Sequence, residues 1–595
     1  MKYTLLKSCL FACVFLFQFP LSQAQDGSAL ATEKEEEGPK FRFNGLGRTI
    51  LAQTGIDGNI LEADSSTIRN LTDGEFLLDL AMNATPNDVT EVQAILRLRN
   101  EFGGFFGSGM SVEVRELWAR GIIANTLRYR VGDMDVVMSP YTLYNPEEEG
   151  SVNEPAVFLP QKEVINYEQF YTDENTRRLQ GAKLDFGLDF ANVLYDADVS
   201  GFIARVRGTD FFTIPTRFVT GGNAQFSTQT FSDSLGLKAD FGLNVVHTFD
   251  DLQSGEAVSG IRNTVYTFNF DVSILDTKKM GLHLIGETGQ SNLEFREDSV
   301  SVFKENDSFL DIGAKLVLKP QKITVSASFV DVGPDFFSIG AQSKRIDFDA
   351  DKSYYNRLGK DNFVRTPGLF DITRDRALYT FQLSDRLMSY DPRFSNTMPY
   401  GTATPNRTGI RFGINHGGSD EILEIGINGA LLSEIRGQGT FELKSFTLLR
   451  GSANVNFHNI SSWEKTLRLT LGYQYEAVNR GGLEVEIVNL TSNLIEVGLE
   501  AELFTNFDIL LGAKLLSAEG REYVPRIDEF NDVKDFPAPY DANDTEQLLA
   551  AGLKYEFKKD VYLTLQYQTF SSKIATDNTN DYNLNQIFVL YNMNF

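Results

Sequence analysis

Apolar and polar residues alternate along most of this chain with a period of two. The segment 467–477 alternates over its whole length, and segments 237–245, 266–274 and 561–567 do the same. Successive side chains of a β-strand point to opposite faces of a sheet, so this period predicts strands with one apolar and one polar face. A strand of about nine to eleven residues also has the length needed to cross a membrane.

The order of the connections separates a membrane barrel from a large soluble all-β protein, such as a solenoid or a propeller, which would also show alternation. Tight turns at 505–506 and 558–560 alternate with long polar stretches, which we place at 517–547 and 571–585. If the C-terminus is periplasmic, the short turns are periplasmic and the long loops extracellular, which is the asymmetry of outer-membrane barrels.

The chain ends on a strand whose apolar residues fall at every second position: Ile587, Val589, Tyr591, Met593 and Phe595. This end resembles that of bacterial outer-membrane β-barrel proteins, whose last strand commonly ends in Phe. The resemblance implies a location in the bacterial outer membrane and recognition of this strand by the barrel-insertion machinery. Lipid contact also demands an apolar outer surface and a closed sheet without free edges.

We therefore predict an all-β fold, a single large antiparallel transmembrane β-barrel over residues 41–595, with about 22 strands (range roughly 18–26). The segments 136–178 and 340–376 show no clear strand pattern, and 390–407, rich in Pro, Gly and aromatic residues, predicts an ordered loop. Wall side chains cannot fill so wide a barrel, so water, loops or a partner must occupy its lumen.

The N-terminal residues predict a secretory signal peptide over 1–24. Lys2 and Lys7 precede an apolar run, and Ser22-Gln23-Ala24 offers small residues for cleavage before Gln25. Residues 25–40 then predict a short, acidic, disordered lead. Both cysteines of the chain lie inside the signal peptide, so we expect no disulfide and no thiolate metal site in the mature protein.

The net charge of the chain and the positions of its histidines argue against two further classes of function. The chain carries 81 acidic and 55 basic residues, a formal charge of −26, which argues against nucleic-acid binding. Its acidic stretches match no EF-hand loop, and we predict no metal site and no cofactor. We also predict no enzyme, because the histidines lie far apart, each on a different predicted strand: His247, His283, His416 and His458.

Pairs of arginines alternate with apolar residues in three segments of the first half, which predicts that they point into the lumen. These candidate pore residues are Arg97, Arg99, Arg128, Arg130, Arg205 and Arg207. They either form a basic stripe that orients anionic or polar solutes, or pair with inward carboxylates such as Glu113, Asp185, Asp189 and Asp240.

The function that this pattern favours is a porin-like channel for polar or anionic solutes. The alternative is a non-conducting barrel in an outer-membrane assembly for secretion, attachment or envelope organisation. The expected partners are outer-membrane lipid, the insertion machinery through the C-terminal strand, and in the alternative an outer-membrane or surface protein that binds the long acidic loops.

Overall fold

The structure is a computed structural model in which most of the chain from residue 40 onward is described. The described ranges are 40–61, 69–102, 109–146, 150–168, 175–190, 193–232, 234–252, 259–297, 300–345, 383, 387–388, 390–418, 420–461, 463–524, 538–576 and 578–595. The predicted signal peptide and most of the predicted acidic lead lie outside these ranges, as does the acidic cluster at 147–149.

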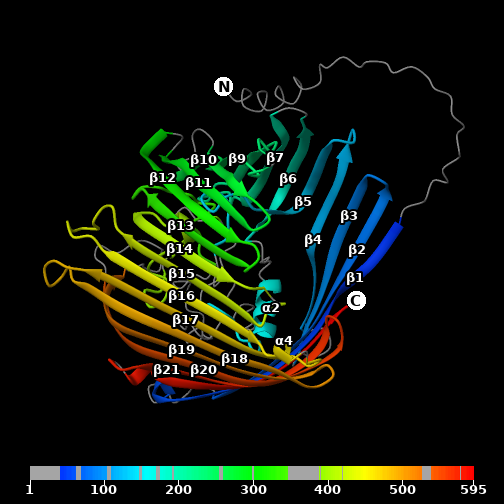
Figure 1. The fold of residues 1–595 in the computed structure, drawn as a ribbon. Helices are drawn as coiled ribbons and strands as arrows, with labels where there is room; N and C mark the ends of the chain where they lie inside the picture. The colour runs from blue at the N-terminus through cyan, green and yellow to red at the C-terminus, as the bar shows by residue number, and fades with distance from the viewer. Residues whose placement is uncertain are drawn as a thin grey trace, which may run out of the picture. The chain divides into compact units, whose positions relative to one another are not determined.

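The alternating segments form 22 strands in one antiparallel sheet (Figure 1). The first eleven are β1 (Lys40–Asp57), β2 (Asn70–Asn87), β3 (Thr90–Glu101), β4 (Met110–Ile123), β5 (Leu127–Val136), β6 (Arg177–Asp189), β7 (Leu194–Arg207), β8 (Arg217–Thr228), β9 (Lys238–Asp250), β10 (Ser259–Asp276) and β11 (Met280–Glu297). The others are β12 (Val300–Leu318), β13 (Ile323–Val332), β14 (Arg407–His416), β15 (Leu423–Ser433), β16 (Ser445–Asn456), β17 (Leu467–Arg480), β18 (Val488–Phe504), β19 (Phe507–Val524), β20 (Ala538–Lys558), β21 (Val561–Ile574) and β22 (Tyr582–Asn594).

The sheet closes on itself because the first strand pairs with the last. The antiparallel register between β1 and β22 runs from Leu46 opposite Asn594 to Asp57 opposite Asn583. Closure leaves no unpaired strand edge between them over this register, as a sheet in lipid requires. The predicted single antiparallel barrel and its strand number are confirmed.

The two ends of the barrel differ in their connections. At one end, which we call the turn end, β18 and β19 are joined at 505–506 and β20 and β21 at 559–560. At the other, which we call the loop end, the connections include 137–176 and 333–406. The predicted loops 517–547 and 571–585 are too long, because β19, β20, β21 and β22 extend through most of them. In these parts of the strands polar residues occur on both faces, so the hydropathy pattern does not indicate a strand there.

The outer surface of the barrel is apolar. Along β20 and β21 the outward side chains Leu549, Leu553, Leu563 and Leu565 are exposed, whereas inward Gln566 is buried. Exposed apolar side chains in alternation with polar inward ones suit a lipid-facing wall. Aromatic side chains gather at the turn end, where Phe557 packs edge-to-face on both Tyr555 and Tyr591, as in the interface belts of membrane proteins.

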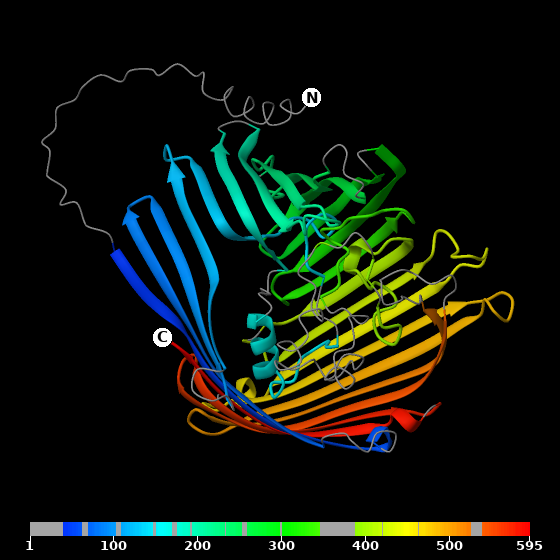
Figure 2. The same ribbon diagram turned by 180° about the vertical axis from the view of Figure 1, so that it is seen from behind.

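The described parts of two loop-end connections fold into the lumen instead of projecting from it. The first inner loop, residues 137–176, carries helix α2 (Leu159–Glu168), and the second inner loop, residues 333–406, carries the 3-10 turn η3 (Gly401–Ala403). Both ribbon views place α2 inside the ring of strands (Figure 2). The first inner loop accounts for the described residues of the segment 136–178, and the predicted order of 390–407 is confirmed. Residues 346–382, which include most of the segment 340–376, lie outside the described ranges.

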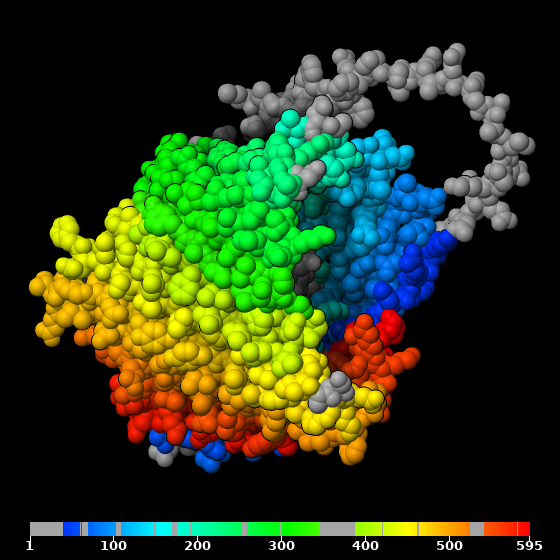
Figure 3. Space-filling model, viewed as in Figure 1, coloured from blue at the N-terminus to red at the C-terminus, as the bar shows by residue number. Residues whose placement is uncertain are grey.

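Three further short elements lie in connections: η1 (Asn59–Leu61), α4 (His458–Ser461) and η4 (Asn578–Asn580). His458 therefore lies in a helical turn, and its placement on a strand was wrong. Among the described residues, no helix is long and apolar enough to cross a membrane. The space-filling view shows a hollow between β1–β4 on one side, in blue, and the green and yellow strands on the other (Figure 3).

The buried apolar core lies between the inner loops and the wall. One cluster joins Val157 and Phe158 of the first inner loop to wall residues such as Leu510 and Leu548. Another joins Ile339 of the second inner loop to Val246 and Ile261 of the wall. Since apolar inward residues occur where a loop covers them, the loops explain the places where the inner face departs from a polar pattern.

Candidate functional site: the lumen and its inner loops

The first inner loop is fixed to the wall by a buried charge cluster on β18 and β19. The backbone N–H groups of Val152 and Asn153 both donate to Glu496, each at 2.8 Å. The ammonium of Lys514, whose side chain is 2% exposed, lies 2.5 Å from Glu154 and 3.4 Å from Glu496. One buried lysine thus compensates two buried carboxylates, one from the loop and one from the wall.

Glycines on the wall make room for this part of the loop. A Cβ on Gly512 of β19 would lie 2.4 Å from Val157, and one on Gly498 of β18 would lie 2.8 Å from Pro155. Real Cβ atoms do not come this close to neighbours, so these positions form a shallow groove that only glycine allows.

The end of α2 is held by three arginines that point inward from β1 and β3. Arg97 contacts Glu168 at 2.8 Å and Arg99 contacts it at 2.5 Å, while Arg48 forms a further ion pair with it. Burial alone would raise the pKa of Glu168, but these arginines lower it to about 2. Cations at a helix C-terminus are also favoured by the helix dipole.

The residue before Glu168 joins the same network. The Tyr167 hydroxyl donates to Asp79 at 2.6 Å, and its backbone carbonyl accepts from Arg115, whose guanidinium lies 3.5 Å from the centre of the tyrosine ring. Asp79 also accepts two hydrogen bonds from Arg97, at 2.9 and 2.8 Å. We call the residues Arg48, Asp79, Arg97, Arg99, Arg115, Tyr167 and Glu168 the α2 latch.

The second inner loop uses a comparable device on β20. Arg393 pairs with Asp391 of its own loop at 2.6 Å and with Glu546 of the wall at 2.8 Å. Nearby, Gln474 of β17 donates to the Phe394 carbonyl at 2.9 Å. Asp544 and Glu546, which the sequence suggested for an extracellular acidic loop, therefore lie on the inner face of a strand.

The two inner loops also bind each other. The backbone N–H of Tyr144 donates to the Gly340 carbonyl at 3.0 Å, and the Ser338 hydroxyl donates to the Thr142 carbonyl at 3.2 Å. Tyr141 stacks on Phe309 of β12 and meets Phe336 edge-to-face. The described parts of the two loops are thus joined to each other and, through Tyr141, to the wall.

The structure places the six candidate arginines in three different environments. Four of them face inward and are paired with carboxylates. Arg97 pairs with Asp79 and Glu168, and Arg99 also pairs with Glu168. Arg130 lies 3.4 Å from Glu116, and Arg207 lies 3.0 Å from Asp250. Arg128 pairs with Asp185, yet its side chain remains 62% exposed. An inward basic stripe of unpaired arginines is therefore absent from these positions.

The predicted inward orientation of Arg205 is wrong. On β7 the buried residues are Phe202 and Ala204, while Ile203 and Arg205 are exposed, so Arg205 shares the outer face with Ile203. A β-bulge between Arg205 and Arg207 shifts the register there. Because a bulge adds one residue to one strand, Arg205 and Arg207 do not share a face although they are two positions apart.

Sequence reasoning missed Arg48, Asp79 and Arg115, although each is a charged residue at an alternating position of a strand. That pattern could have identified them as inward-facing. Nothing in the local sequence distinguishes Tyr167 or Glu168, because their role depends on a loop folding back onto distant strands. Among the described residues, no group of three or more His, Cys, Asp or Glu side chains is placed to hold a metal ion.

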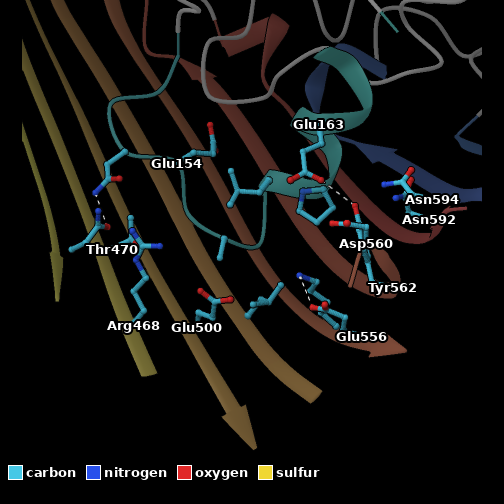
Figure 4. A pocket seen from close by; sticks show the side chains of 17 residues that line it. Glu154, Glu163, Arg468, Thr470, Glu500, Glu556, Asp560, Tyr562, Asn592 and Asn594 are labelled. Atoms are coloured by element: carbon cyan, nitrogen blue, oxygen red, sulfur yellow. Dashed lines mark hydrogen bonds and ion pairs between the residues drawn. The ribbon is translucent and has the colours of Figure 1, made fainter. Parts of the chain in front are cut away.

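A pocket of about 740 Å³ opens at the turn end beneath the first inner loop (Figure 4). One side of the pocket is formed by α2 and the residues before it. On this side Glu163 accepts a hydrogen bond from the Tyr562 hydroxyl at 3.1 Å. The other side is formed by the turn-end parts of β16–β22. Its polar lining residues include Asn153, Glu154, Arg468, Thr470, Glu500, Lys554, Glu556, Asp560, Asn592 and Asn594.

The inner face of β6 and β7 near the turn end is acidic. Asp189 lies opposite Asp196 and Gly187 lies opposite Asp198 in the register of these strands. Among the described residues, no cation lies within ion-pair distance of Asp189, Asp196 or Asp198. Of the four carboxylates first considered as arginine partners, Asp185 alone pairs with a candidate arginine in the described part of the chain.

No protein-family model matches the chain, and no curated protein matches it. Among solved structures, it is similar to the ferric citrate transporter FecA in the unliganded form, with 10% identity over 93% of this chain and 78% of FecA and a TM-score of 0.47. It is also similar to Pseudomonas aeruginosa OccK9 (OpdG), with 9% identity over 93% and 98% of the two chains and a TM-score of 0.33.

A third similar structure is a loop-deletion mutant of OmpT, an outer membrane protein of Vibrio cholerae, with 9% identity over 94% and 100% of the chains and a TM-score of 0.24. Likenesses this weak say nothing about a solute. The closed 22-strand sheet with an apolar outer face is the fold of bacterial outer-membrane β-barrels.

Proposed function

We propose that this protein is an outer-membrane channel for small polar solutes, gated by its own inner loops. The observation that carries the proposal is the α2 latch, in which wall arginines hold Glu168 of a loop inside the lumen. Ion pairs of this kind can be exchanged for contacts with water or solute. Breaking the latch would free the C-terminal end of α2 from β1 and β3, while the apolar contacts of Val157 and Phe158 with the wall hold the preceding part of the loop and the barrel stays intact.

The pairing of the arginines changes the expected selectivity. Most of the candidate arginines are neutralised by carboxylates, and the turn-end face of β6 and β7 is acidic. An anion would meet no free basic stripe along the described lumen, so we propose neutral or cationic polar solutes rather than anionic ones.

The test is single-channel recording of the refolded mature protein in a planar bilayer. We expect brief openings for the wild-type protein and a several-fold longer open time for Glu168→Gln, which removes the charge that the arginines hold. Glu163→Gln is the matched control, because Glu163 lies on the same helix but its carboxylate accepts a hydrogen bond only from Tyr562 among the described residues and forms no ion pair with the wall arginines. Folded, inserted protein that stays silent in both wild type and Glu168→Gln would contradict the channel.

One face of the C-terminal strand points outward from the barrel. Ile587 and Phe595 are exposed on the outer face, while Phe588 and Leu590 of the same strand are buried against α2. We propose that the barrel-insertion machinery recognises the outward residues of β22 before the inner loops fold into the lumen. Deletion of Phe595 should then lower the yield of inserted barrel in cells more than the yield of refolding in detergent.

A role in an outer-membrane assembly is favoured by one separate observation. Phe211 and Phe212 in the β7–β8 connection at the loop end are 88% and 85% exposed, and Asp210 holds their loop by accepting backbone hydrogen bonds from Phe212, Thr213 and Ile214. An ordered loop that exposes two phenylalanines is suited to a protein partner. Partners that co-purify with the wild type but not with Phe211→Ser/Phe212→Ser would support this second function.

A further inference from the structure

The turn-end pocket has features that the α2 latch does not use. Its carboxylates outnumber its cations: Glu154, Glu163, Glu500, Glu556 and Asp560 stand against Arg468 and Lys554. The strands bring these groups together from distant parts of the sequence, and the first inner loop covers them. The pocket is thus a joint product of the barrel wall and the loop.

Both cations of the pocket already have partners. Arg468 lies 3.7 Å from Glu424, and Lys554 lies 4.0 Å from Glu556 and over the ring of Tyr562. Glu154 is likewise compensated, by Lys514. Glu500 and Asp560 differ, because no cation among the described residues lies within ion-pair distance of either carboxylate.

Uncharged groups complete the lining. Thr470 is more than nine-tenths buried and lines the pocket, and its hydroxyl forms no hydrogen bond among the described residues. Asn592 and Asn594 add amides from the end of β22, while Leu159, Pro160 and Leu510 provide apolar surface. Figure 4 shows Glu500 of β18 and Asp560 of the turn between β20 and β21 separated across the pocket. A solute with a cationic amine and a short apolar or hydroxylated body matches this combination.

We propose that the turn-end pocket is a binding site for small organic cations, compounds that carry one or two amino groups. Glu500 and Asp560 bind the ammonium groups, and the Thr470 hydroxyl and the asparagine amides accept or donate the remaining hydrogen bonds. The acidic inner face of β6 and β7 strengthens the selection, since a negatively charged vestibule concentrates cations and repels anions. The site deepens the proposed channel function, on which it rests for its physiological meaning, by naming the solute class.

Binding to the pocket can be measured without measuring conduction, so the binding site and the channel can be tested independently. Isothermal titration of the full, refolded mature chain in detergent with butane-1,4-diamine should show saturable binding, and titration with citrate should show none. Glu500→Gln/Asp560→Asn should weaken diamine binding on the order of tenfold or more, because it removes the two carboxylates that form no ion pair among the described residues. Asp560 has a positive φ of 64°, a conformation that Asn tolerates, so the substitution preserves the turn.

Asp420→Asn is the matched control, since Asp420 is an exposed carboxylate of the turn end that pairs with Lys322 and lies outside the pocket. It should leave diamine binding unchanged. Equal binding by wild type and Glu500→Gln/Asp560→Asn would overturn the site, as would citrate binding comparable to that of the diamine. If the double variant fails to fold, Glu500→Gln alone carries the test. A silent bilayer with intact diamine binding would overturn the channel and leave the site standing.

Discussion

Gly45 and Phe595 close the barrel by exchanging both of their backbone hydrogen bonds. The Gly45 N–H donates to the Phe595 carbonyl at 2.9 Å, and the Phe595 N–H donates to the Gly45 carbonyl at 3.1 Å. The pairing lies just beyond the regular register of β1 and β22. Phe595 is thereby part of the seam.

Substitution of Gly45 should impair closure. A Cβ at Gly45 would lie 2.2 Å from the Asp79 carbonyl oxygen and 2.9 Å from the Phe595 ring, and the carbonyl is backbone that cannot rotate away. Gly45→Val should therefore lower the refolded fraction, measured by the heat-modifiable mobility of the barrel on gels. Gly47→Ala is the control, because its nearest neighbour is the flexible end of Met593 at 3.2 Å. Normal refolding of Gly45→Val would contradict the close fit.

Loss of Lys514 should destabilise the folded barrel strongly. Lys514→Met would leave Glu154 and Glu496 buried without their common cation, which typically costs about 3–5 kcal/mol. Denaturant unfolding in detergent measures the difference from the wild type. Lys319→Met, which removes an exposed lysine paired with Asp276, should have little effect. Equal losses of unfolding free energy in both variants would show that the buried ion pairs stabilise the barrel no more than an exposed pair does.

A side chain at Gly512 should displace the first inner loop without opening the sheet. Gly512→Val would collide with Val157 and Phe158, whereas Gly451→Ala meets nothing within 4 Å and serves as the control. We expect faster amide hydrogen exchange in residues 150–158 and unchanged exchange in the strands of Gly512→Val. Unaltered exchange in 150–158 would mean that the glycine groove does not hold this segment.

Charge reversal at Arg128 should change ion selectivity, because its side chain is exposed on the inner face. Arg128→Glu adds negative charge beside Asp185 and should shift the reversal potential under a salt gradient toward cations. Arg205→Glu changes the charge equally but on the outer face of β7, so it should leave the reversal potential unchanged. The same shift for both variants would contradict the orientation of Arg205.

Acid should release α2. The pKa of Glu168 is lowered from its usual 4.5 to about 2, so its ionised form stabilises the loop fully above the usual value and loses this effect as pH falls toward 2. The stabilisation at neutral pH is on the order of 3 kcal/mol. Hydrogen exchange of residues 159–168 should accelerate as pH is lowered from 4.5 to 2, after correction for intrinsic rates. Glu168→Gln should lack this dependence, and an equal response in the variant would assign it to another group.

Local alternation was sufficient to predict the lipid-facing parts of the strands, since a lipid-facing residue must be apolar whatever the rest of the chain does. It was less reliable where wall residues meet the inner loops. Phe588 and Leu590 are apolar on the inner face because α2 covers them, and the strand ends around Leu516 and Leu548 are buried by the first inner loop. Sequence spacing also gave no sign of the bulge at Arg205, because a bulge is fixed by pairing with a neighbouring strand.

The sequence by itself determined the class of fold, the approximate strand number and the inward direction of most candidate arginines. These follow from the period of two and from the demand of lipid for an apolar face and a closed sheet. Only the tertiary structure decided what fills the lumen and whether the arginines are free. Glu168 meets Arg48 across 120 positions, and Asn153 meets Glu496 across 343. Such contacts depend on the path of two long loops through the barrel, which no local pattern encodes.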